Sequence, residues 1–206
     1  MSASILRVFI VLLLVTKPLF AWADNQILVL GDSLSAAYGL KQHQGWVQLL
    51  QDTYEQQNTP TTLINASISG ETTGGALRRL DAILKEHTPT HVLIELGGND
   101  GLRGFPVTKM KANLHALIDK SQEAGAEVAL MQIRIPPNYG RRYTELFEQS
   151  FVEVAKEKQV TLMPFFVEQV ATDGELMQND NIHPNAEAQP ILRDIMKTQI
   201  SNWLTK

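Results

Sequence analysis

Five short apolar runs alternate along this chain with longer segments of helical periodicity, and this alternation restricts the possible folds more than any other feature. The runs cover residues 27–30, 61–66, 91–96, 128–133 and 160–163. The helical segments cover residues 45–57, 73–86, 107–124, 141–158 and 186–204. Strands that are apolar throughout are buried on both faces, as in a parallel sheet covered by helices. The sequence therefore predicts an α/β fold, a three-layer α/β/α sandwich around a five-stranded parallel sheet.

The first 23 residues have the pattern of a secretory signal peptide. A basic start that includes Arg7 precedes the apolar run 8–15, and an Ala-Trp-Ala motif follows at 21–23. A membrane anchor or a core strand is the alternative, but the run is too short to span a bilayer and a Lys-Pro pair interrupts it. We expect a signal peptide over residues 1–23 and one domain over residues 24–206. The expected location is the periplasm of a Gram-negative bacterium, or otherwise the medium.

Composition excludes several classes of function. The chain has no cysteine, which rules out disulfides, thiolate catalysis and zinc sites with cysteine ligands. Without the signal peptide it carries 16 basic and 22 acidic side chains, a net charge of −6, and no basic run that would mark a nucleic-acid site. We therefore expect small-molecule partners, no nucleic acid, no stable membrane anchor after signal cleavage, and a monomer.

Three of the predicted strands run directly into polar or glycine-rich stretches at their carboxyl ends. These stretches are Gly-Asp-Ser at 31–33, Ser-Ile-Ser-Gly-Glu at 67–71 and Gly-Gly-Asn-Asp-Gly at 97–101. Each could be an ordinary turn, because these residue types favour turns. Open α/β sheets, however, bind their ligands beyond the carboxyl ends of the strands. The predicted fold brings all three stretches to that edge.

One histidine stands in a setting that suits a serine nucleophile. Such a nucleophile needs a base, normally histidine, and a group that orients the base. His183 follows Asp180 by three residues, and Pro184 keeps it out of a helix, so both side chains share a compact loop. The carboxylate can then hold Nδ1 of the imidazole and leave Nε2 free to face Ser33. The alternative is a polar turn that caps the last helix, with Asn185 as N-cap.

Taken together, these stretches resemble the SGNH (GDSL-type) hydrolases. The matching blocks are GDSLS at 31–35, NASISGET at 65–72, GGND at 97–100 and DNIHP at 180–184, in the family's order and spacing. Two longer stretches, ELGGNDGLRG and MQIRIPPNYGRRY, are similar to the bacterial multifunctional thioesterases and lysophospholipases of that family. An α/β-hydrolase elbow fits less well, since it needs glycine where this chain has Ser35. The resemblance implies a flavodoxin-like form of the predicted fold.

The resemblance also implies a role for each matching residue. Ser33 is the implied nucleophile, His183 the general base and then acid, and Asp180 the group that holds the imidazole. The implied oxyanion hole consists of the backbone N–H groups of Ser33 and Gly70 and the side-chain amide of Asn99. Glycine lets the backbone approach a reacting carbonyl, and an amide donates to negative charge without titrating. No metal and no cofactor are expected.

The sequence identifies the substrate-binding residues less specifically than the catalytic residues. Apolar residues follow the third and fourth predicted strands, where loops are usually polar: Leu102, Phe105, Ile135, Pro137 and Tyr139. They either line a groove for an acyl chain, as the resemblance implies, or cover the core. We expect a broad serine hydrolase that cleaves acyl thioesters and carboxylic esters, including acyl-CoA, lysophospholipids and aryl esters, through an acyl-enzyme. The alternatives are a carbohydrate O-acetyl esterase of the same fold and a non-catalytic periplasmic binding module.

Overall fold

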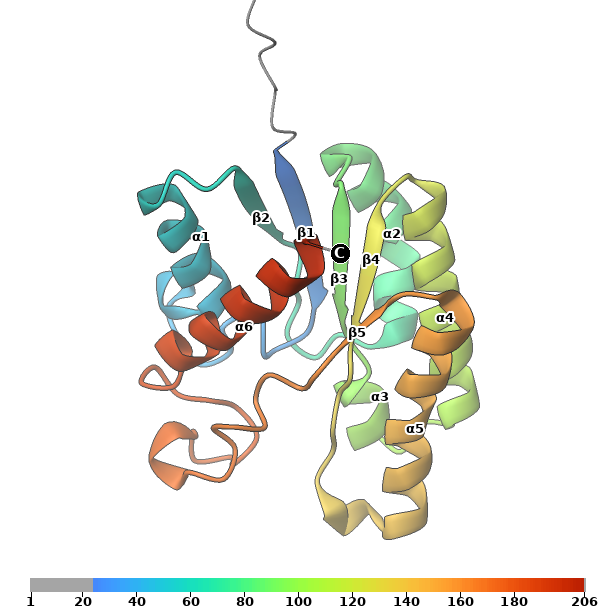
Figure 1. Ribbon diagram of the computed structural model, residues 1–206. Helices are drawn as coiled ribbons and strands as arrows, with labels where there is room; N and C mark the ends of the chain where they lie inside the picture. Colours follow the sequence, from blue (N-terminus) through green and yellow to red (C-terminus); the bar gives the residue numbers. More distant parts are fainter. Residues whose placement is uncertain (1–23, 206) are drawn as a thin grey trace, which may run out of the picture.

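A computed structural model describes residues 24–205, which are built around one parallel sheet with the strand order β2-β1-β3-β4-β5 (Figure 1). The strands are β1 (Asn25–Gly31), β2 (Thr61–Asn65), β3 (His91–Glu95), β4 (Glu127–Met131) and β5 (Thr161–Met163). Every neighbouring pair is parallel, so the predicted fold class is confirmed. The predicted signal peptide lies outside the described residues.

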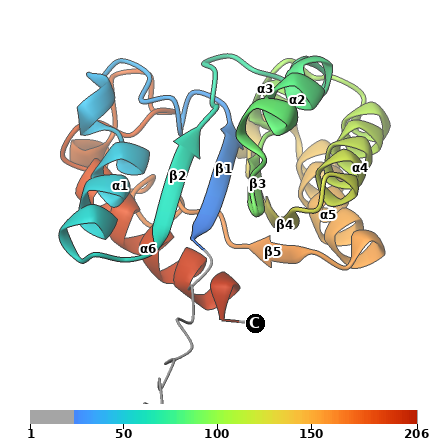
Figure 2. The same ribbon diagram turned by 90° about the horizontal axis from the view of Figure 1, so that it is seen from above.

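Helices cover both faces of the sheet (Figure 2). α1 (Trp46–Gln56) and α6 (Gln189–Leu204) pack together on one face, and α2 (Thr73–His87), α4 (Val107–Glu123) and α5 (Arg141–Lys158) form a layer on the other. The shorter elements are α3 (Gly98–Leu102) and the 3₁₀ turns η1 (Gln42–Gln44), η2 (Pro137–Tyr139) and η3 (Gly174–Leu176). Of the helices within residues 24–205, none combines the length and the apolar character needed to span a bilayer.

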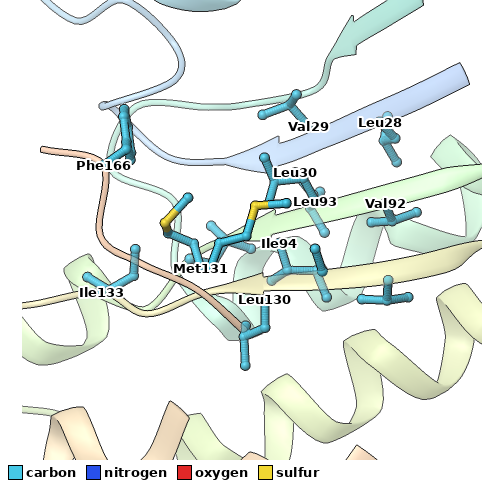
Figure 3. Packing of buried hydrophobic residues seen from close by; sticks show 14 of the residues in the cluster. Leu28, Val29, Leu30, Val92, Leu93, Ile94, Leu130, Met131, Ile133 and Phe166 are labelled. Carbon is cyan, nitrogen blue, oxygen red and sulfur yellow. The ribbon is translucent and has the colours of Figure 1, made fainter. Parts of the chain in front are cut away.

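The two helical layers explain why the central strands are mostly apolar. Successive side chains of a strand point to opposite faces, and here both faces lie under helices, so most positions of the central strands are buried. Leu28 and Leu30 of β1, Leu93 of β3 and Leu130 of β4 are completely buried (Figure 3). Burial of each such side chain stabilises the fold by about 1.5–3 kcal/mol relative to exposure. The core therefore holds the central strands, and the residues that follow them, in fixed positions.

The structure differs from the predicted elements in two places. The stretch Gly98–Leu102, where no helix was predicted, forms the short helix α3, which Gly97 allows by adopting a positive φ of 118°. The last helix begins at Gln189, three residues later than predicted. The side chain of Asn185 accepts a hydrogen bond from the N–H of Ala188 at 3.2 Å, so Asn185 caps the preceding turn and is not the helix N-cap.

The strand order places a topological switch point between β1 and β3. The chain moves from β1 outward to β2 and then returns to the other side of β1, so the segments after β1 and β3 leave the sheet side by side. Gly31, the last residue of β1, pairs with Glu95, the last residue of β3. Ligands of open α/β sheets bind at such a point. Ser33 and Asn99 follow these two strands.

Candidate active site

Ser33 lies two residues beyond β1 on a tight turn at the carboxyl edge of the sheet. The carbonyl of Asp32 accepts a hydrogen bond from the N–H of Ala36 at 2.9 Å, and the carbonyl of Ser33 accepts one from the N–H of Tyr38 at 3.2 Å. The buried carboxylate of Asp32 also accepts from the N–H of Leu34 at 3.1 Å. The turn is therefore closed by its own backbone and by the side chain of the residue before the serine.

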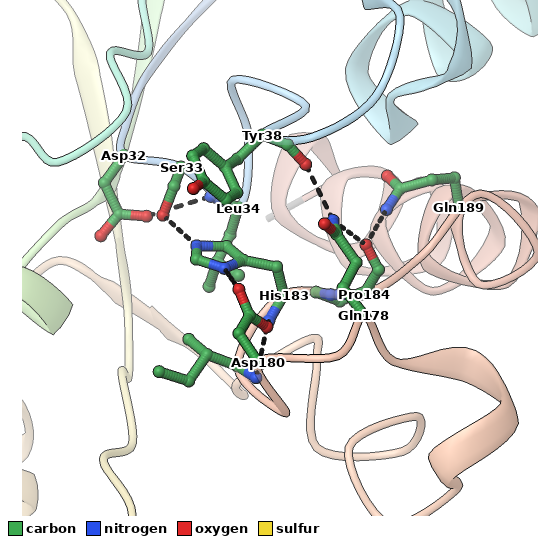
Figure 4. Close-up of polar contacts among 10 residues, drawn as sticks. Asp32, Ser33, Leu34, Tyr38, Gln178, Asp180, His183, Pro184 and Gln189 are labelled. Atoms are coloured by element: carbon green, nitrogen blue, oxygen red, sulfur yellow. Dashed lines mark hydrogen bonds and ion pairs between the residues drawn. The ribbon is translucent and has the colours of Figure 1, made fainter.

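The structure brings Ser33, His183 and Asp180 into one hydrogen-bonded chain (Figure 4). Nε2 of His183 lies 2.8 Å from Oγ of Ser33, and its Nδ1 lies 2.6 Å from Oδ2 of Asp180. Oδ1 of Asp180 accepts from the N–H groups of Ile182 and His183. Burial opposes ionisation of Asp180, but these hydrogen bonds and the nearby imidazole outweigh it and hold the pKa of the Asp180 carboxyl below its ordinary value.

The loop that carries Asp180 and His183 is closed at its base like a small hairpin. Met177 and Pro184 form an isolated antiparallel bridge. The N–H of Gln178 donates to the carbonyl of His183 at 2.8 Å, and the N–H of Asn185 donates to the carbonyl of Leu176 at 2.9 Å. The two segments 176–178 and 183–185 thus pair with each other. They present the Asp-x-x-His motif at the tip of the loop, toward Ser33.

The three predicted oxyanion groups lie around the same serine. Gly70 and Asn99 line one cavity together with Ser33. Within residues 24–205 neither the N–H of Ser33 nor that of Gly70 donates a hydrogen bond to protein, so both are available to a ligand. Gly70 has a φ of +79°, which favours glycine, and its carbonyl accepts from the Arg103 guanidinium at 3.0 Å. Nδ2 of Asn99 donates one hydrogen to Oδ2 of Asp32 at 3.2 Å, which leaves its second hydrogen free.

A second carboxyl group lies beneath the turn. Oε2 of Glu95, which is fully buried, accepts from the hydroxyl of Ser35 at 2.8 Å and from the N–H of Asp32 at 3.3 Å. Burial raises the pKa of Asp32 to about 6, and burial together with repulsion from Asp32 raises the pKa of Glu95 well above its ordinary value. Each of these two carboxyl groups therefore opposes ionisation of the other, and the hydrogen bonds from Asn99 and Leu34 stabilise the charged form of Asp32.

A cavity of about 680 Å³ opens beside Ser33, and segments that follow all five strands line it. Of the five residues predicted to bind substrate, Leu102, Ile135 and Pro137 line the cavity. Phe105 and Tyr139 lie outside the lining. Tyr139 instead donates from its hydroxyl to the carbonyl of Leu102 at 2.9 Å, so it stabilises the backbone of a lining residue.

Several residues of the cavity were not predicted from the sequence. Those with apolar side chains are Leu34, Tyr38, Ile133, Phe165, Val167, Ala171, Met177 and Ile182. Phe165 and Val167 follow β5, and the rule that identified apolar residues after β4 applies equally there. Tyr38 had a weaker signal in the sequence, since an aromatic residue five positions after the serine could equally belong to the hydrophobic core. In the structure its ring centroid lies 4.4 Å from the ring centroid of His183.

Residues 24–205 contain no group of three or more His, Asp or Glu side chains placed to hold a metal ion. His87 and His91, which are spaced by four residues, have separate partners. Nε2 of His87 lies 3.9 Å from Glu86, and Nε2 of His91 lies 3.9 Å from Glu127. The pair therefore gives no indication of a shared ligand.

Most of the chain matches one protein family. Residues 29–190 match the model of the GDSL-like Lipase/Acylhydrolase family. An arylesterase of Vibrio mimicus is 47% identical over 182 residues, which cover 88% of this chain and 91% of that protein. The Escherichia coli (strain K12) protein named thioesterase 1/protease 1/lysophospholipase L1 is 47% identical over 189 residues, which cover 92% of this chain and 89% of that protein.

A solved structure agrees with the fold over the same length. The crystal structure of the psychrotrophic esterase EstA from Pseudoalteromonas sp., inhibited by monoethylphosphonate, superposes with a TM-score of 0.88 at 60% sequence identity. The match covers 89% of this chain and all of that chain. The family match, the relatives and the shared fold all point the same way: this chain belongs to the GDSL-like lipase/acylhydrolase family.

Proposed function

We propose that this protein is a serine hydrolase that cleaves carboxylic esters and acyl thioesters through an acyl-enzyme. The observation that carries the proposal is the continuous chain from Asp180 through His183 to Ser33 at the wall of a largely apolar cavity. A serine hydroxyl is a weak nucleophile by itself and becomes effective when a base takes its proton during attack. Nε2 of His183 lies within the range of 2.6–3.2 Å that such a transfer needs.

In the first half of the reaction, Oγ of Ser33 attacks the carbonyl carbon of the substrate while His183 takes the hydroxyl proton. The Asp180 carboxylate keeps Nδ1 protonated and stabilises the imidazolium that forms. His183 then gives the proton to the departing alcohol or thiol. The C–O or C–S bond of the substrate breaks, and the acyl group remains on Ser33 as an ester.

The negative charge that develops on the substrate oxygen needs donors that are already in place. The N–H groups of Ser33 and Gly70 and the free hydrogen of the Asn99 amide supply them. Asp32 holds the other hydrogen of that amide and therefore fixes its orientation before substrate arrives. Loss of one such donor typically costs about 3–4 kcal/mol of transition-state stabilisation.

The second half repeats these steps with water as the nucleophile. His183 takes a proton from water, the hydroxide attacks the acyl carbon, and the same donors stabilise the second oxyanion. Collapse of this intermediate breaks the bond to Ser33, whose oxygen recovers the proton from His183. The products are a carboxylic acid and the free enzyme, so the cycle needs no cofactor.

The size and lining of the cavity support acyl chains as substrates. Leu102, Ile135 and Pro137 contribute to a wall that favours methylene groups over sugar hydroxyls, since an apolar wall offers few hydrogen-bond partners. The names of the two relatives support aryl esters, thioesters and lysophospholipids as substrate classes. Rates on acetyl and octanoyl esters separate this proposal from a carbohydrate O-acetyl esterase, which should reject the longer chain.

The test of the reaction is the Ser33→Ala variant, assayed with p-nitrophenyl butyrate and with a fluorophosphonate probe. The wild-type protein should hydrolyse the ester and become labelled, whereas Ser33→Ala should do neither. His183→Ala should label and turn over far more slowly than the wild type. Hydrolysis at the wild-type rate by Ser33→Ala would refute the proposal. A wild-type protein that never labels would favour the binding-module alternative.

We also propose that the protein is exported, that it has no membrane anchor after signal cleavage, and that it acts as a monomer. The signal-peptide pattern in residues 1–23 supports the first two statements. N-terminal sequencing of protein from the periplasm or medium should begin at Asp24. Light scattering after gel filtration should give the mass of one chain, and a dimer mass would contradict the third statement.

A further inference from the structure

The side chain of Gln178 joins two loops that come from opposite ends of the chain. Its Nε2 donates to the carbonyl of Tyr38 at 2.8 Å and to the carbonyl of Pro184 at 3.1 Å (Figure 4). Tyr38 lies five residues after Ser33, and Pro184 lies directly after His183. Both hydrogens of one amide are therefore used to connect the serine loop to the histidine loop, across 140 residues of sequence.

Gly39 provides independent evidence that this amide is fitted to its place. A Cβ atom at position 39 would overlap Oε1 of Gln178, and the φ of Gly39 is +75°. Only glycine combines this backbone conformation with so close an approach at little cost. The serine loop thus leaves room for the Gln178 side chain at the same point where Tyr38 accepts its hydrogen bond.

The Tyr38 ring connects this contact to the reacting imidazole. Its centroid lies 4.4 Å from the centroid of His183, with the two planes inclined at 38°. Asp180 holds one edge of the imidazole at Nδ1, and the Tyr38 ring covers a face that hydrogen bonds do not restrain. A displacement of Tyr38 would therefore release the ring of His183 as well as the base of its loop.

We propose that Gln178 is a positioning residue that sets the separation of Ser33 and His183 by fixing the histidine loop to Tyr38. The inference rests on the proposed function, because it concerns alignment of the same two side chains. The segment 176–185 lies at the surface and has no strand of the sheet to hold it. Errors near 1 Å in the placement of reacting groups can lower a rate by about 100-fold, so a contact that prevents such errors affects turnover more than binding.

The test is Gln178→Met, which keeps the length of the side chain and removes both donors. The matched control is Gln199→Met on α6, where the same change removes a hydrogen bond from Nε2 to the carbonyl of Pro164 at 3.2 Å, and neither residue lines the cavity. For Gln178→Met we expect kcat on p-nitrophenyl butyrate to fall about 10-fold or more with KM within about 2-fold. Labelling by the fluorophosphonate should slow in proportion. Gln199→Met should keep the wild-type kcat and labelling rate.

A second pair of variants keeps the inference testable if Gln178→Met does not fold. Gly39→Ala retains the amide but pushes it away, and Gly125→Ala is its control. Gly125 also has a positive φ, +88°, but a Cβ there would meet no atom within 4 Å. We expect Gly39→Ala to lose kcat as Gln178→Met does, and Gly125→Ala to lose stability only.

Three results would overturn the inference. The first is a wild-type kcat in Gln178→Met or, if that variant does not fold, in Gly39→Ala. The second is a change in KM with kcat unaffected, and the third is an equal fall in kcat in the control variants. If Ser33→Ala is inactive while these variants turn over normally, only the role of Gln178 fails. If Ser33→Ala is active, the proposed function fails first.

Discussion

The two halves of the catalytic group are held in different ways. The nucleophile side, residues 31–40 with Glu95 beneath them, continues directly from the central strands β1 and β3 and rests on buried carboxyl groups. The base side, residues 176–185, lies at the surface, and hydrogen bonds within the loop together with the Gln178 amide hold it. The core therefore supports one reacting atom, whereas short-range polar contacts support the other.

This difference indicates where each kind of mutation should act. On the nucleophile side a substitution disturbs the core, so it should change the free energy of unfolding as much as the rate. On the base side a substitution should change the rate and leave unfolding almost unaffected. The four predictions below test that division.

The largest effect is expected on the base side, from Asp180→Asn. The new amide oxygen can still accept from the N–H groups of Ile182 and His183, so the loop should keep its shape. The partner of Nδ1 is lost, however, and the wrong imidazole tautomer is then favoured, which lowers kcat by roughly 10³–10⁴-fold in serine hydrolases. Steady-state rates and thermal melts check this together. A kcat within 10-fold of the wild type, or a large fall in melting temperature, would contradict the division.

A smaller loss of rate is expected from Asn99→Ala. Asn99 follows β3, and its amide donates a hydrogen bond to Asp32 of the nucleophile side. This variant removes an oxyanion donor and leaves Oδ2 of Asp32 without its amide partner. We expect kcat to fall about 10²–10³-fold with KM nearly unchanged. Unlike Asp180→Asn, it should also lower the free energy of unfolding, by about 1–3 kcal/mol, because a buried carboxylate loses a hydrogen bond. Asn202→Ala at an exposed position of α6 is the control and should match the wild type in both measurements.

Alanine substitutions at two glycines, Gly31 and Gly174, test how tightly each side is packed. A Cβ at Gly31 would lie 2.6 Å from Oε2 of Glu95 and 2.8 Å from Oγ of Ser67, whereas a Cβ at Gly174, just before the base side, would meet nothing within 4 Å. Overpacking a filled core typically costs about 1–3 kcal/mol, so Gly31→Ala should lower the free energy of unfolding by that amount. Gly174→Ala should stay within about 0.5 kcal/mol of the wild type. Denaturant titrations measure both, and equal values would show that the two sides do not differ in packing.

The smallest effect is expected from Glu95→Gln and depends on pH. Because the pKa values of Glu95 and Asp32 are raised in the folded protein, the folded state binds more protons than the unfolded chain once pH exceeds about 4. The contribution of the pair to stability is therefore complete at low pH and is lost as pH rises, through about 6 for Asp32 and through the raised pKa of Glu95.

Glu95→Gln keeps an oxygen for Ser35 and Asp32 and cannot ionise, so it should lose less stability than the wild type as pH rises. The expected difference in unfolding free energy between pH 5 and pH 8 is on the order of 1 kcal/mol, with kcat changed by less than about 3-fold. Melts across that range measure it. A parallel decline in both proteins would show that Glu95 does not bind the extra proton.

The central part of the fold follows from the sequence because burial on both faces leaves a clear pattern. The runs that became β1, β3 and β4 are apolar at almost every position, and their positions in the sheet agree with the prediction to within two residues. α3 was missed because five residues are too few to show a helical period, and its start depends on the backbone of Gly97 and not on a side-chain pattern.

The site could be located from the sequence only where residue types are chemically specific. Ser33, Asp180 and His183 stand out because few side chains can serve as nucleophile, orienting group and base. Gln178 and Tyr38 carry no such signal, since glutamine and tyrosine occur in any surface loop. Their importance arises from contacts between loops 140 residues apart, which a single sequence does not contain.

The cavity has a consequence for how this enzyme can change over generations. Much of its apolar wall comes from residues 133–137 and 165–171, which hold none of the proposed reacting groups. A mutation at Ile135 or Val167 can therefore widen, narrow or redirect the cavity while the hydrogen bonds around Ser33 stay as they are. Natural selection can therefore change the substrate range of the enzyme through one loop at a time, while the catalytic residues keep their arrangement at every step.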